Sequence, residues 1–491
     1  MRPIFMSVLA AILTAGAPVA AEERLPADER LYVVAVSDVT YADKDWRPVV
    51  DALVEKHAAK VVRYKGNVTS AKDALAAWMP DYICFVARPE EAGRGFVVAV
   101  SRMTRKLDND FYTDALWGIL TGYEAADALR IAKRKEPLTI TRGASGAGAG
   151  VLGGLATGFA SAETSVVRFW VKQGDKWEER RVTPDPAEAL AEGFNTMRPQ
   201  VFFTSGHATE HDWQIGYRVK AGQFRHKNGR LFSINTAGAV FKIDSPEPKV
   251  YLPMGNCLIG HVDRRDCMVT AWIHSGGVYQ MYGYTAVTWN GLMGWGTKNR
   301  FAGGGENLAE AFYWTNQGLL KTLHEKYAQF AGIDFETYDQ RKISWLANRH
   351  KLVRLNPKTN KPEMWRDPMA LLWDRDCVAF YGDPAWDARM PRRELDWTRE
   401  WSGGTGAWTL TITPKKDAAG PGRLWLFLPE RLTDVRVVKG ADLVEAVTDN
   451  FIMARPKPKD GYKRDLPVVI EITGKPMIRP RLTRPATAPA D

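Results

Sequence analysis

Residues 200–207 read Q-V-F-F-T-S-G-H and residues 249–257 read K-V-Y-L-P-M-G-N-C, so two apolar runs each end on a reactive side chain. A short apolar run followed by Gly or Asn is typical of a buried strand that delivers a functional group to the carboxyl edge of an α/β sheet. Here the two strand ends carry the imidazole of His207 and the thiol of Cys257. A thiol and an imidazole together make a nucleophile and its acid–base partner. The sequence therefore predicts a cysteine hydrolase.

The roles of the two side chains follow from thiol chemistry. The thiolate of Cys257 would attack a carbonyl carbon, and His207 would protonate the leaving amine and then activate water. The backbone N–H groups of Ala208 and Cys257 are the expected oxyanion donors, because loops beyond strand ends expose such groups. His207 precedes Cys257 by 50 residues, which is about the separation and the order found in caspases.

A second motif overlaps the first and leaves a metal mechanism open. Residues 207–211 read H-A-T-E-H and fit the H-x-x-E-H pattern of inverted zinc peptidases, with His207 and His211 as ligands and Glu210 as general base. That mechanism needs the two histidines one helical turn apart. The strand that precedes them and the W-Q-I-G at 213–216 that follows favour a loop instead.

The remaining cysteines carry no comparable pattern. Cys84 lies inside an apolar run, and Cys267 and Cys377 each precede one, so we expect three buried thiols. Four cysteines in 491 residues also exclude a dense disulfide framework. His261, four residues past Cys257, is interpreted either as a second base or as a surface imidazole.

The composition indicates a globular protein with a sizeable core. Apolar residues make up 45% of the chain and aromatic residues 11%, which favours folded domains over disorder. The net charge of +10 comes from basic residues scattered among acids. Nucleic-acid binding would need a basic stripe, and short clusters such as Arg130–Lys135 do not form one. We expect a peptide or protein substrate and no nucleic acid, and the oligomeric state stays open.

The N-terminus reads as a targeting segment. Arg2 supplies a positive charge, Val8–Ala17 a short apolar core, and Val19–Ala21 a small-residue cleavage site. The apolar core is too short to span a bilayer, and no later stretch is long and apolar enough to do so. The sequence therefore predicts a protein exported to the periplasm or the extracellular space, without a membrane span.

Strand and helix signals alternate between residues 31 and 135, which predicts a parallel sheet covered on both faces. The apolar run Phe96–Val100 is interpreted as one of its strands, and Ser70 as the cap of a helix that reaches Trp78. The Gly/Ala-rich run Gly143–Ala162 is interpreted as a mobile, exposed loop, with a flap over the site as the alternative. From Trp397 onward, short strands between turn residues predict an antiparallel β-sandwich.

These signals divide the chain into parts with different expected structures. In chain order they are a signal peptide (1–21), an N-terminal α/β subdomain (22–142), a Gly/Ala-rich loop (143–164), a catalytic α/β subdomain (165–394), a β-sandwich domain (395–475) and a disordered tail (476–491). The predicted fold class is α/β, with a parallel-sheet catalytic domain in two subdomains followed by the β-sandwich.

With these motifs in order, residues of about 30–385 resemble the gingipain-type cysteine peptidases of the caspase-like clan. The resemblance rests on S-G-H-A-T-E at 205–210 before Trp213, G-N-C at 255–257, G-G-V at 276–278 leading to Thr285 and Trp289, and Y-G-D-P at 381–384. It implies a caspase-like fold followed by an immunoglobulin-like domain. One departure is Ala208, because the family usually has Gly after the catalytic histidine.

The resemblance also implies a substrate pocket. Trp289 matches a wall of the primary pocket, and Asp114 or Asp110 is the acid we expect at its base, where it would select Arg or Lys in the substrate. The alternative is that both aspartates cap a turn before Tyr112 and Trp117. No cofactor is expected for catalysis, no metal is expected in the site, and a structural calcium ion stays open.

The overall interpretation is an exported cysteine endopeptidase with a Cys257–His207 dyad. The alternatives are a non-catalytic binding protein on the same fold, a zinc metallopeptidase that uses the H-x-x-E-H motif, and a cysteine transpeptidase in which an amine resolves the acyl-enzyme.

Overall fold

The computed structural model describes residues 30–458 and 461–479. The chain divides into an α/β unit, which runs to Phe301 and continues over Glu306–Pro391, and a smaller β unit over Arg392–Met477 with Ala302–Gly305. The predicted signal peptide and residues 480–491 of the predicted tail lie outside the described residues. No helix within the described ranges is long and apolar enough to cross a membrane.

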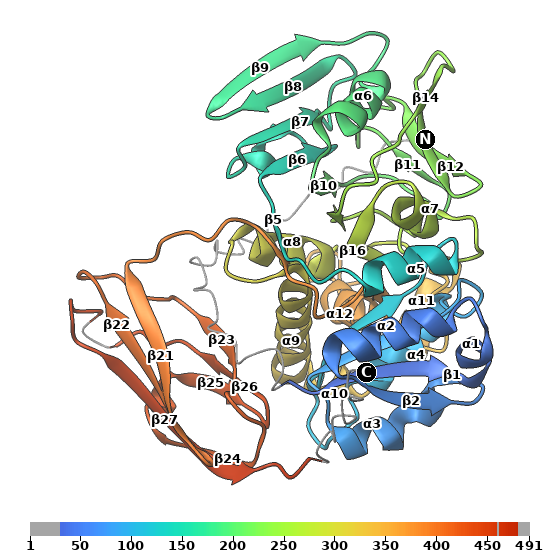
Figure 1. Cartoon of the computed structure of the whole chain (residues 1–491). Helices are drawn as coiled ribbons and strands as arrows, with labels where there is room; N and C mark the ends of the chain where they lie inside the picture. The colour runs from blue at the N-terminus through green and yellow to red at the C-terminus, as the bar shows by residue number, and fades with distance from the viewer. Residues whose placement is uncertain (1–29, 459–460, 480–491) are drawn as a thin grey trace, which may run out of the picture. The chain divides into compact units, whose positions relative to one another are not determined.

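A twelve-stranded sheet forms the centre of the α/β unit (Figure 1), with the strand order β2-β1-β3-β4-β19-β16-β15-β10-β6-β7-β8-β9. Its strands, in chain order, are β1 (Tyr32–Ser37), β2 (Lys60–Tyr64), β3 (Tyr82–Val86), β4 (Leu116–Leu120), β6 (Arg142–Ser145), β7 (Thr157–Ser161), β8 (Arg168–Gln173), β9 (Lys176–Arg181), β10 (Val201–Thr204), β15 (Lys249–Pro253), β16 (Val278–Tyr284) and β19 (Val378–Tyr381). The strands at its centre are buried throughout, as expected for parallel strands covered on both faces.

The strand direction of this sheet reverses between its two parallel sets and again at the edge, where β7–β8 and β8–β9 pair antiparallel. Strands β1 to β4 and β19 run parallel to one another, and so do β6, β7, β10, β15 and β16. The two sets meet at the antiparallel pair β16–β19, with Tyr284 opposite Val378. The carboxyl ends of β10, β15 and β16 therefore lie on the same sheet edge as the amino end of β4.

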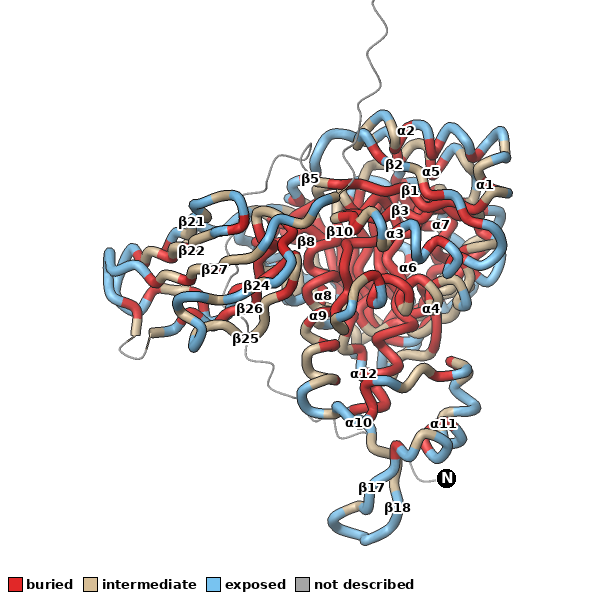
Figure 2. Tube along the Cα trace, turned by 90° about the horizontal axis from the view of Figure 1, so that it is seen from below, coloured by how far each residue is buried: buried red, intermediate tan, exposed pale blue. Residues whose placement is uncertain are grey.

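Helices cover both faces of the sheet. In Figures 1 and 2, α2 and α5 lie on one face of the β1–β4 half, and α4, α9 and α12 lie on the other. The helices are α1 (Asp38–Ala42), α2 (Arg47–His57), α3 (Lys72–Trp78), α4 (Arg94–Met103), α5 (Ala125–Ala132), α6 (Ala187–Met197), α7 (Met268–His274), α8 (Leu292–Ala302), α9 (Leu308–Lys326), α10 (Ala328–Ala331), α11 (Ile343–Arg349) and α12 (Arg366–Cys377).

Two local predictions in the first half are wrong. The run Phe96–Val100 belongs to helix α4, not to a strand, because its buried residues Val97, Val100 and Ser101 recur at helical spacing. Ser70 does not cap helix α3, which is preceded by a 3₁₀ turn, and its hydroxyl donates to the backbone oxygens of Lys65 and Asn67. The strand β4 carries the sequence L-W-G-I-L and was not predicted.

The Gly/Ala-rich run is not an exposed loop. Strands β6 and β7 both lie in it and pair in parallel, and β6 also pairs with β10. The backbones approach so closely that a Cβ on Gly158 would lie 2.6 Å from the Gly143 carbonyl oxygen. Glycine is required by this packing and does not signal mobility, because only a residue without a Cβ fits there.

The β unit is a sandwich of two antiparallel sheets. One has the order β21-β22-β27-β24 and the other β23-β26-β25, and alternate residues of both form one apolar core that includes Leu410, Leu424 and Ile470. Its strands are β21 (Trp397–Gly404), β22 (Ala407–Pro414), β23 (Leu424–Phe427), β24 (Leu432–Lys439), β25 (Val444–Val447), β26 (Phe451–Ala454) and β27 (Val468–Pro476). The predicted fold class, α/β with a C-terminal β-sandwich, is confirmed.

Smaller sheets complete the α/β unit. Strands β11 (Asp212–Gln214), β12 (Gln223–Lys227), β13 (Arg230–Ile234) and β14 (Val240–Lys242) form a four-stranded antiparallel sheet. Two-stranded sheets pair β5 (Leu138–Thr139) with β20 (Ala388–Arg389), and β17 (Val353–Leu355) with β18 (Pro362–Met364).

Amide exchange tests the placement of the Gly/Ala-rich run. The backbone N–H groups of β6 and β7 should exchange slowly, because each strand has hydrogen-bonded neighbours on both sides in the sheet. Hydrogen–deuterium exchange with peptide-level mass spectrometry measures this. Fast exchange throughout 142–161, as fast as in an exposed hairpin, would contradict the placement.

Candidate active site

The two predicted catalytic residues lie beyond the ends of neighbouring parallel strands. Strands β10 and β15 pair directly, with Thr204 opposite Pro253. His207 follows Thr204 by three residues and Cys257 follows Pro253 by four. The fold therefore brings both to the same stretch of the carboxyl edge, as the sequence predicts. His207 is exposed and Cys257 is half-buried, so both are accessible from solvent.

The side chain of Asn256 links the two loops that carry them. Its Oδ1 accepts a hydrogen bond from the Thr204 hydroxyl at 2.7 Å, and its Nδ2 donates to the Gly206 carbonyl oxygen at 3.1 Å. Since the Thr204 hydroxyl donates its proton to Asn256, it accepts from the Tyr251 hydroxyl at 2.9 Å. Burial raises the pKa of the Tyr251 hydroxyl, which stays protonated as a donor. The fully buried Asn256 amide thus joins the residue before Cys257 to the residue before His207.

A buried tryptophan packs against the His207 loop. Trp213 is fully buried, and its indole N–H donates to the Ser205 carbonyl oxygen at 2.9 Å. Its ring packs on Phe202 of β10 with centroids 5.6 Å apart. A Cβ on Gly146 would lie 2.2 Å from the Trp213 ring, so the end of β6 must be glycine for the indole to fit. Figure 1 shows β6 and β10 side by side.

A short backbone bridge closes the His207 loop. Ala208 and Trp213 form an isolated antiparallel bridge, in which the amides of Thr209 and Gln214 are the donors. The Ala208 amide is outside this bridge. Gly206 has a φ of +96°, a value suited to glycine, and the Tyr217 ring stacks beside the His207 imidazole with centroids 5.4 Å apart.

Cys257 differs from the other three cysteines. All four are free thiols, but Cys84, Cys267 and Cys377 are fully buried, as the sequence predicts. Burial raises the pKa of the Cys267 thiol to about 11, and it also raises the pKa of the other two. The Cys257 sulfur accepts a hydrogen bond from the Thr288 amide at 3.4 Å.

Leu258, the residue after Cys257, adopts the left-handed conformation with a φ of +58°. This conformation is uncommon for leucine and is often found at functional turns. The Leu258 amide donates to the Ala286 carbonyl oxygen, and the Thr288 hydroxyl donates to the Asn256 carbonyl oxygen at 3.2 Å. The segment after β16 therefore holds the Cys257 turn from its other side.

The H-x-x-E-H residues separate in space instead of converging. Residues 207–211 form no helix. The Glu210 carboxylate pairs with the His261 Nδ1 at 2.9 Å, and the His211 ring pairs with His226 and Asp263 at 3.2 Å each. Glu210 pairs with His261 and is not placed as a general base between His207 and His211. The geometry therefore does not favour a zinc ion bound by the two histidines.

The Glu210–His261 pair joins the His207 loop to the turn after Cys257. Arg94 adds to it, with its Nη2 3.4 Å from the His261 Nδ1 and its Nε donating to the Thr285 carbonyl oxygen at 2.6 Å. Glu210 and His261 therefore position each other through this contact. The structure places His261 in this contact, half-buried, and not as a free surface imidazole.

Glu163 is a site residue that was not found from the sequence. It follows strand β7, whose carboxyl end lies on the same edge as those of β10 and β15, and its carboxylate accepts a hydrogen bond from the Ser205 hydroxyl. The Glu163 carbonyl oxygen also accepts from the Tyr217 amide at 2.9 Å. Glu163 therefore supports both segments that flank the His207 imidazole. Because the sequence predicts a loop over β7, it gives no indication that Glu163 lies at this sheet edge.

Two tryptophans lie in the chain after strand β16. Trp289 is half-buried and stacks on Trp373, with centroids 6.0 Å apart. Trp295 was not predicted, yet a Cβ on Gly255 would lie 3.4 Å from its indole nitrogen, and 37% of its surface is exposed. The Trp295 indole therefore lies beside the residue two positions before Cys257.

The two aspartates proposed for the pocket base are engaged within their own loop. Asp114 is buried and accepts from the Leu107 amide at 3.1 Å, and Asp110 accepts from the Tyr112 amide at 2.7 Å. This is the bonding expected of turn-capping residues. Their carboxylate oxygens and one of Asp108 all lie within 4.8 Å of one another, a spacing that could hold a metal ion, and a structural calcium ion stays a prediction.

No protein-family model and no curated protein sequence matches the chain. Among solved structures, the Arg-specific cysteine proteinase gingipain R matches with a TM-score of 0.41 and 11% sequence identity, over 93% of this chain and 97% of that chain. A complex of the pro- and mature domains of RgpB from Porphyromonas gingivalis matches with a TM-score of 0.37 and 10% identity, over 90% of this chain and 99% of that chain.

Replacing Asn256 tests the link between the two loops. Asn256→Ala should lower the free energy of unfolding by about 1–3 kcal/mol, because the Thr204 hydroxyl and the Gly206 carbonyl lose a buried partner. At temperatures where the variant is still fully folded, kcat should nevertheless fall, because the loops of His207 and Cys257 are no longer linked. Thermal unfolding and kcat measure the two effects.

Gln280→Ala is the matched control. Its buried amide nitrogen also makes two hydrogen bonds, to the carbonyl oxygens of Asp383 and Trp386, but Gln280 lies near the amino end of β16, at the sheet edge opposite Cys257. Equal kcat for the two variants would contradict a positioning role for Asn256.

Proposed function

We propose that this chain is a cysteine endopeptidase, with Cys257 as nucleophile and His207 as acid–base. The observation that carries the proposal is the pairing of β10 with β15, which sets a half-exposed thiol and an exposed imidazole beyond neighbouring strand ends. The buried link through Asn256 supports it, because it holds the two loops together. A thiol and an imidazole held in this way can perform acyl transfer.

The reaction would proceed in two stages. The Cys257 sulfur bonds to the carbonyl carbon of the scissile peptide, and His207 transfers the thiol proton to the leaving amine as the C–N bond breaks. Water then attacks the thioester carbonyl and gives a proton to His207. The C–S bond breaks, the carboxylic acid product leaves, and the proton returns to the sulfur, which regenerates the Cys257 thiol. The amides of Ala208 and Cys257 would bind the oxyanion in both stages.

The residues around the site suit a peptide substrate. Tyr217 beside His207 is 43% exposed, and Trp289 and Trp295 follow β16, with Trp295 in helix α8. Aromatic side chains with an exposed face bind extended peptides through apolar contact with little loss of conformational entropy. A transpeptidase would share the first stage and differ only in the acceptor.

Export remains part of the proposal. The residues that carry the targeting signal lie outside the described chain, so the signal peptide is a prediction from the sequence alone. An exported cysteine peptidase must keep its nucleophile reduced, and Cys257 is a free thiol like the other three cysteines.

Replacement of the nucleophile is the primary test. Cys257→Ala should lower kcat for peptide hydrolysis by several orders of magnitude, because no other group can form the acyl-enzyme. The melting temperature should stay close to that of the wild type, since the thiol is not a core residue. Cys84→Ala is the control, because it removes a fully buried thiol and should lower stability while hydrolysis persists.

The same assay separates the alternatives. Iodoacetamide should inactivate the enzyme and zinc-selective chelators should not. A zinc peptidase would show bound zinc in stoichiometric amount and lose activity on its removal. A binding protein would show no hydrolysis in either the wild type or the Cys257→Ala variant, and retained activity in that variant would exclude the dyad.

Substrate choice is a separate prediction. If Asp114 or Asp110 forms the base of the primary pocket, the enzyme prefers Arg or Lys before the cleaved bond. Asp114→Asn and Asp110→Asn should then lower kcat/KM for basic substrates far more than for neutral ones. The amide bonds that both carboxylates accept inside their loop favour the alternative, in which the variants lose stability and change no preference. A peptide-library profile without basic preference would discard the acid pocket and leave the dyad unaffected.

A further inference from the structure

A basic module projects from the α/β unit. It comprises residues 336–366 and contains helix α11 and the hairpin β17–β18. In Figure 2 the hairpin and α11 extend beyond the body of the unit, and their trace is mostly exposed. The module serves none of the roles assigned to the site, so its surface properties need their own explanation.

The hairpin has one polar face and one apolar face. Arg354 lies opposite Glu363, and their side chains pair on one face at 3.3 Å. Val353 and Leu355 therefore point to the other face, together with their cross-strand partners Met364 and Pro362. On that face Leu355 is 60% exposed and Val353 38% exposed, so no described part of the chain covers it. An uncovered apolar face of this kind marks an interaction surface.

The module also carries an excess of positive charge. Its 31 residues contain eight Lys and Arg but three Asp and Glu. Each acid already pairs with an arginine: Glu336 with Arg349, Asp339 with Arg341, and Glu363 with Arg354. The lysines around the hairpin are therefore not neutralised within the module. They are Lys351, Lys358 and Lys361, all exposed.

The hairpin tip and helix α11 add exposed basic and aromatic side chains to the module. The Asn356 Oδ1 accepts from the amides of Lys358 and Thr359 at 2.8 and 3.1 Å, so the lysines of the tip project from an ordered turn. Trp345 of α11 is 49% exposed, with the Arg349 guanidinium 5.3 Å from its ring centre. Lysines, an exposed tryptophan and exposed aliphatic residues together are the composition of a surface that enters a lipid interface.

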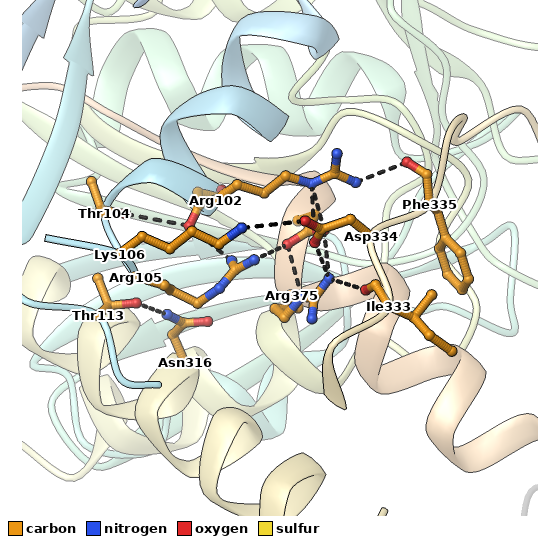
Figure 3. Close-up of polar contacts among 12 residues, drawn as sticks. Arg102, Thr104, Arg105, Lys106, Thr113, Asn316, Ile333, Asp334, Phe335 and Arg375 are labelled. Atoms are coloured by element: carbon orange, nitrogen blue, oxygen red, sulfur yellow. Dashed lines mark hydrogen bonds and ion pairs between the residues drawn. The ribbon is translucent and has the colours of Figure 1, made fainter. Parts of the chain in front are cut away.

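The base of the module is held rigidly. Figure 3 shows Arg375 and Arg102 reaching its root: Arg375 Nη2 donates to the Asp334 carboxylate at 2.9 Å, and Arg102 Nη2 donates to the Phe335 carbonyl oxygen at 2.8 Å. At the far end, the Trp365 amide donates to the Leu352 carbonyl oxygen, and its ring packs against Phe330 with centroids 5.6 Å apart. The apolar face is therefore presented in a fixed position, which lowers the entropy cost of binding.

We propose that the β17–β18 face of this module docks on the surface of an anionic lipid bilayer. Val353 and Leu355 enter the interfacial region, and the lysines contact the lipid phosphates. A projecting convex element reaches a flat surface before the rest of the unit does, whereas a groove would be expected for capture of an extended peptide. The unneutralised lysines select an anionic surface over a neutral one.

Vesicle co-sedimentation of the whole protein tests the proposal. The protein should sediment with vesicles of mixed phosphatidylcholine and phosphatidylglycerol, and not with phosphatidylcholine alone, and added salt should release it. Leu355→Glu should weaken binding by at least about tenfold, since it places a charge on the inserted face. Replacing Lys358 and Lys361 by Glu should weaken it and reduce the salt dependence.

Val240→Glu is the matched control. Val240 lies in β14 outside the module and is 59% exposed, close to the 60% of Leu355, so its replacement should not change vesicle binding. Leu355→Glu should also leave peptide hydrolysis unchanged, which separates this proposal from the active site. Absence of vesicle binding, equal binding to neutral vesicles, or equal effects of the two glutamates would overturn it. So would a concentration-dependent dimer, seen by sedimentation velocity without lipid, that Leu355→Glu abolishes.

Discussion

The hydrogen bonds of the buried Asn256 amide are the constraint on which the site depends. They join Thr204 and Gly206 at the end of β10 to the turn that follows β15. A loop beyond a strand end is mobile by default, and two such loops would present their reactive groups in many relative positions. Because the amide is fully buried, breaking the link leaves unpaired polar groups in the interior, so the two loops are held as one unit.

The strands of the α/β unit bring further groups to the sheet edge that carries His207 and Cys257. The reversal at β16–β19 lets one sheet continue through both halves of the α/β unit, while strands β6, β7, β10 and β15 all end on the same side. Three of these ends contribute a different group: Glu163 after β7, His207 after β10 and Cys257 after β15. Trp213, wedged against Gly146 and bonded to Ser205, supports this edge from the core.

The positions of Cys257 and His207 could be predicted from the sequence because each follows a compact apolar strand, and strand ends are a local signal. Glu163 and Asn256 could not, because their roles come from contacts across strands far apart in the chain. The Gly/Ala-rich run was read as a loop because glycine weakens strand propensity, whereas here it permits close packing of β6 and β7. Phe96–Val100 was read as a strand because a short apolar run does not by itself distinguish a strand from a buried helix.

Covalent labelling tests the central claim most directly. A peptidyl acyloxymethyl ketone reacts with a thiolate only when the peptide part binds and an acid–base group is in place. Intact-mass analysis followed by peptide mapping should find one adduct, on Cys257, that forms much more slowly in the His207→Ala variant. An adduct on Cys84, Cys267 or Cys377, or no adduct on the folded protein, would contradict the assignment of Cys257 and His207 as the reacting pair.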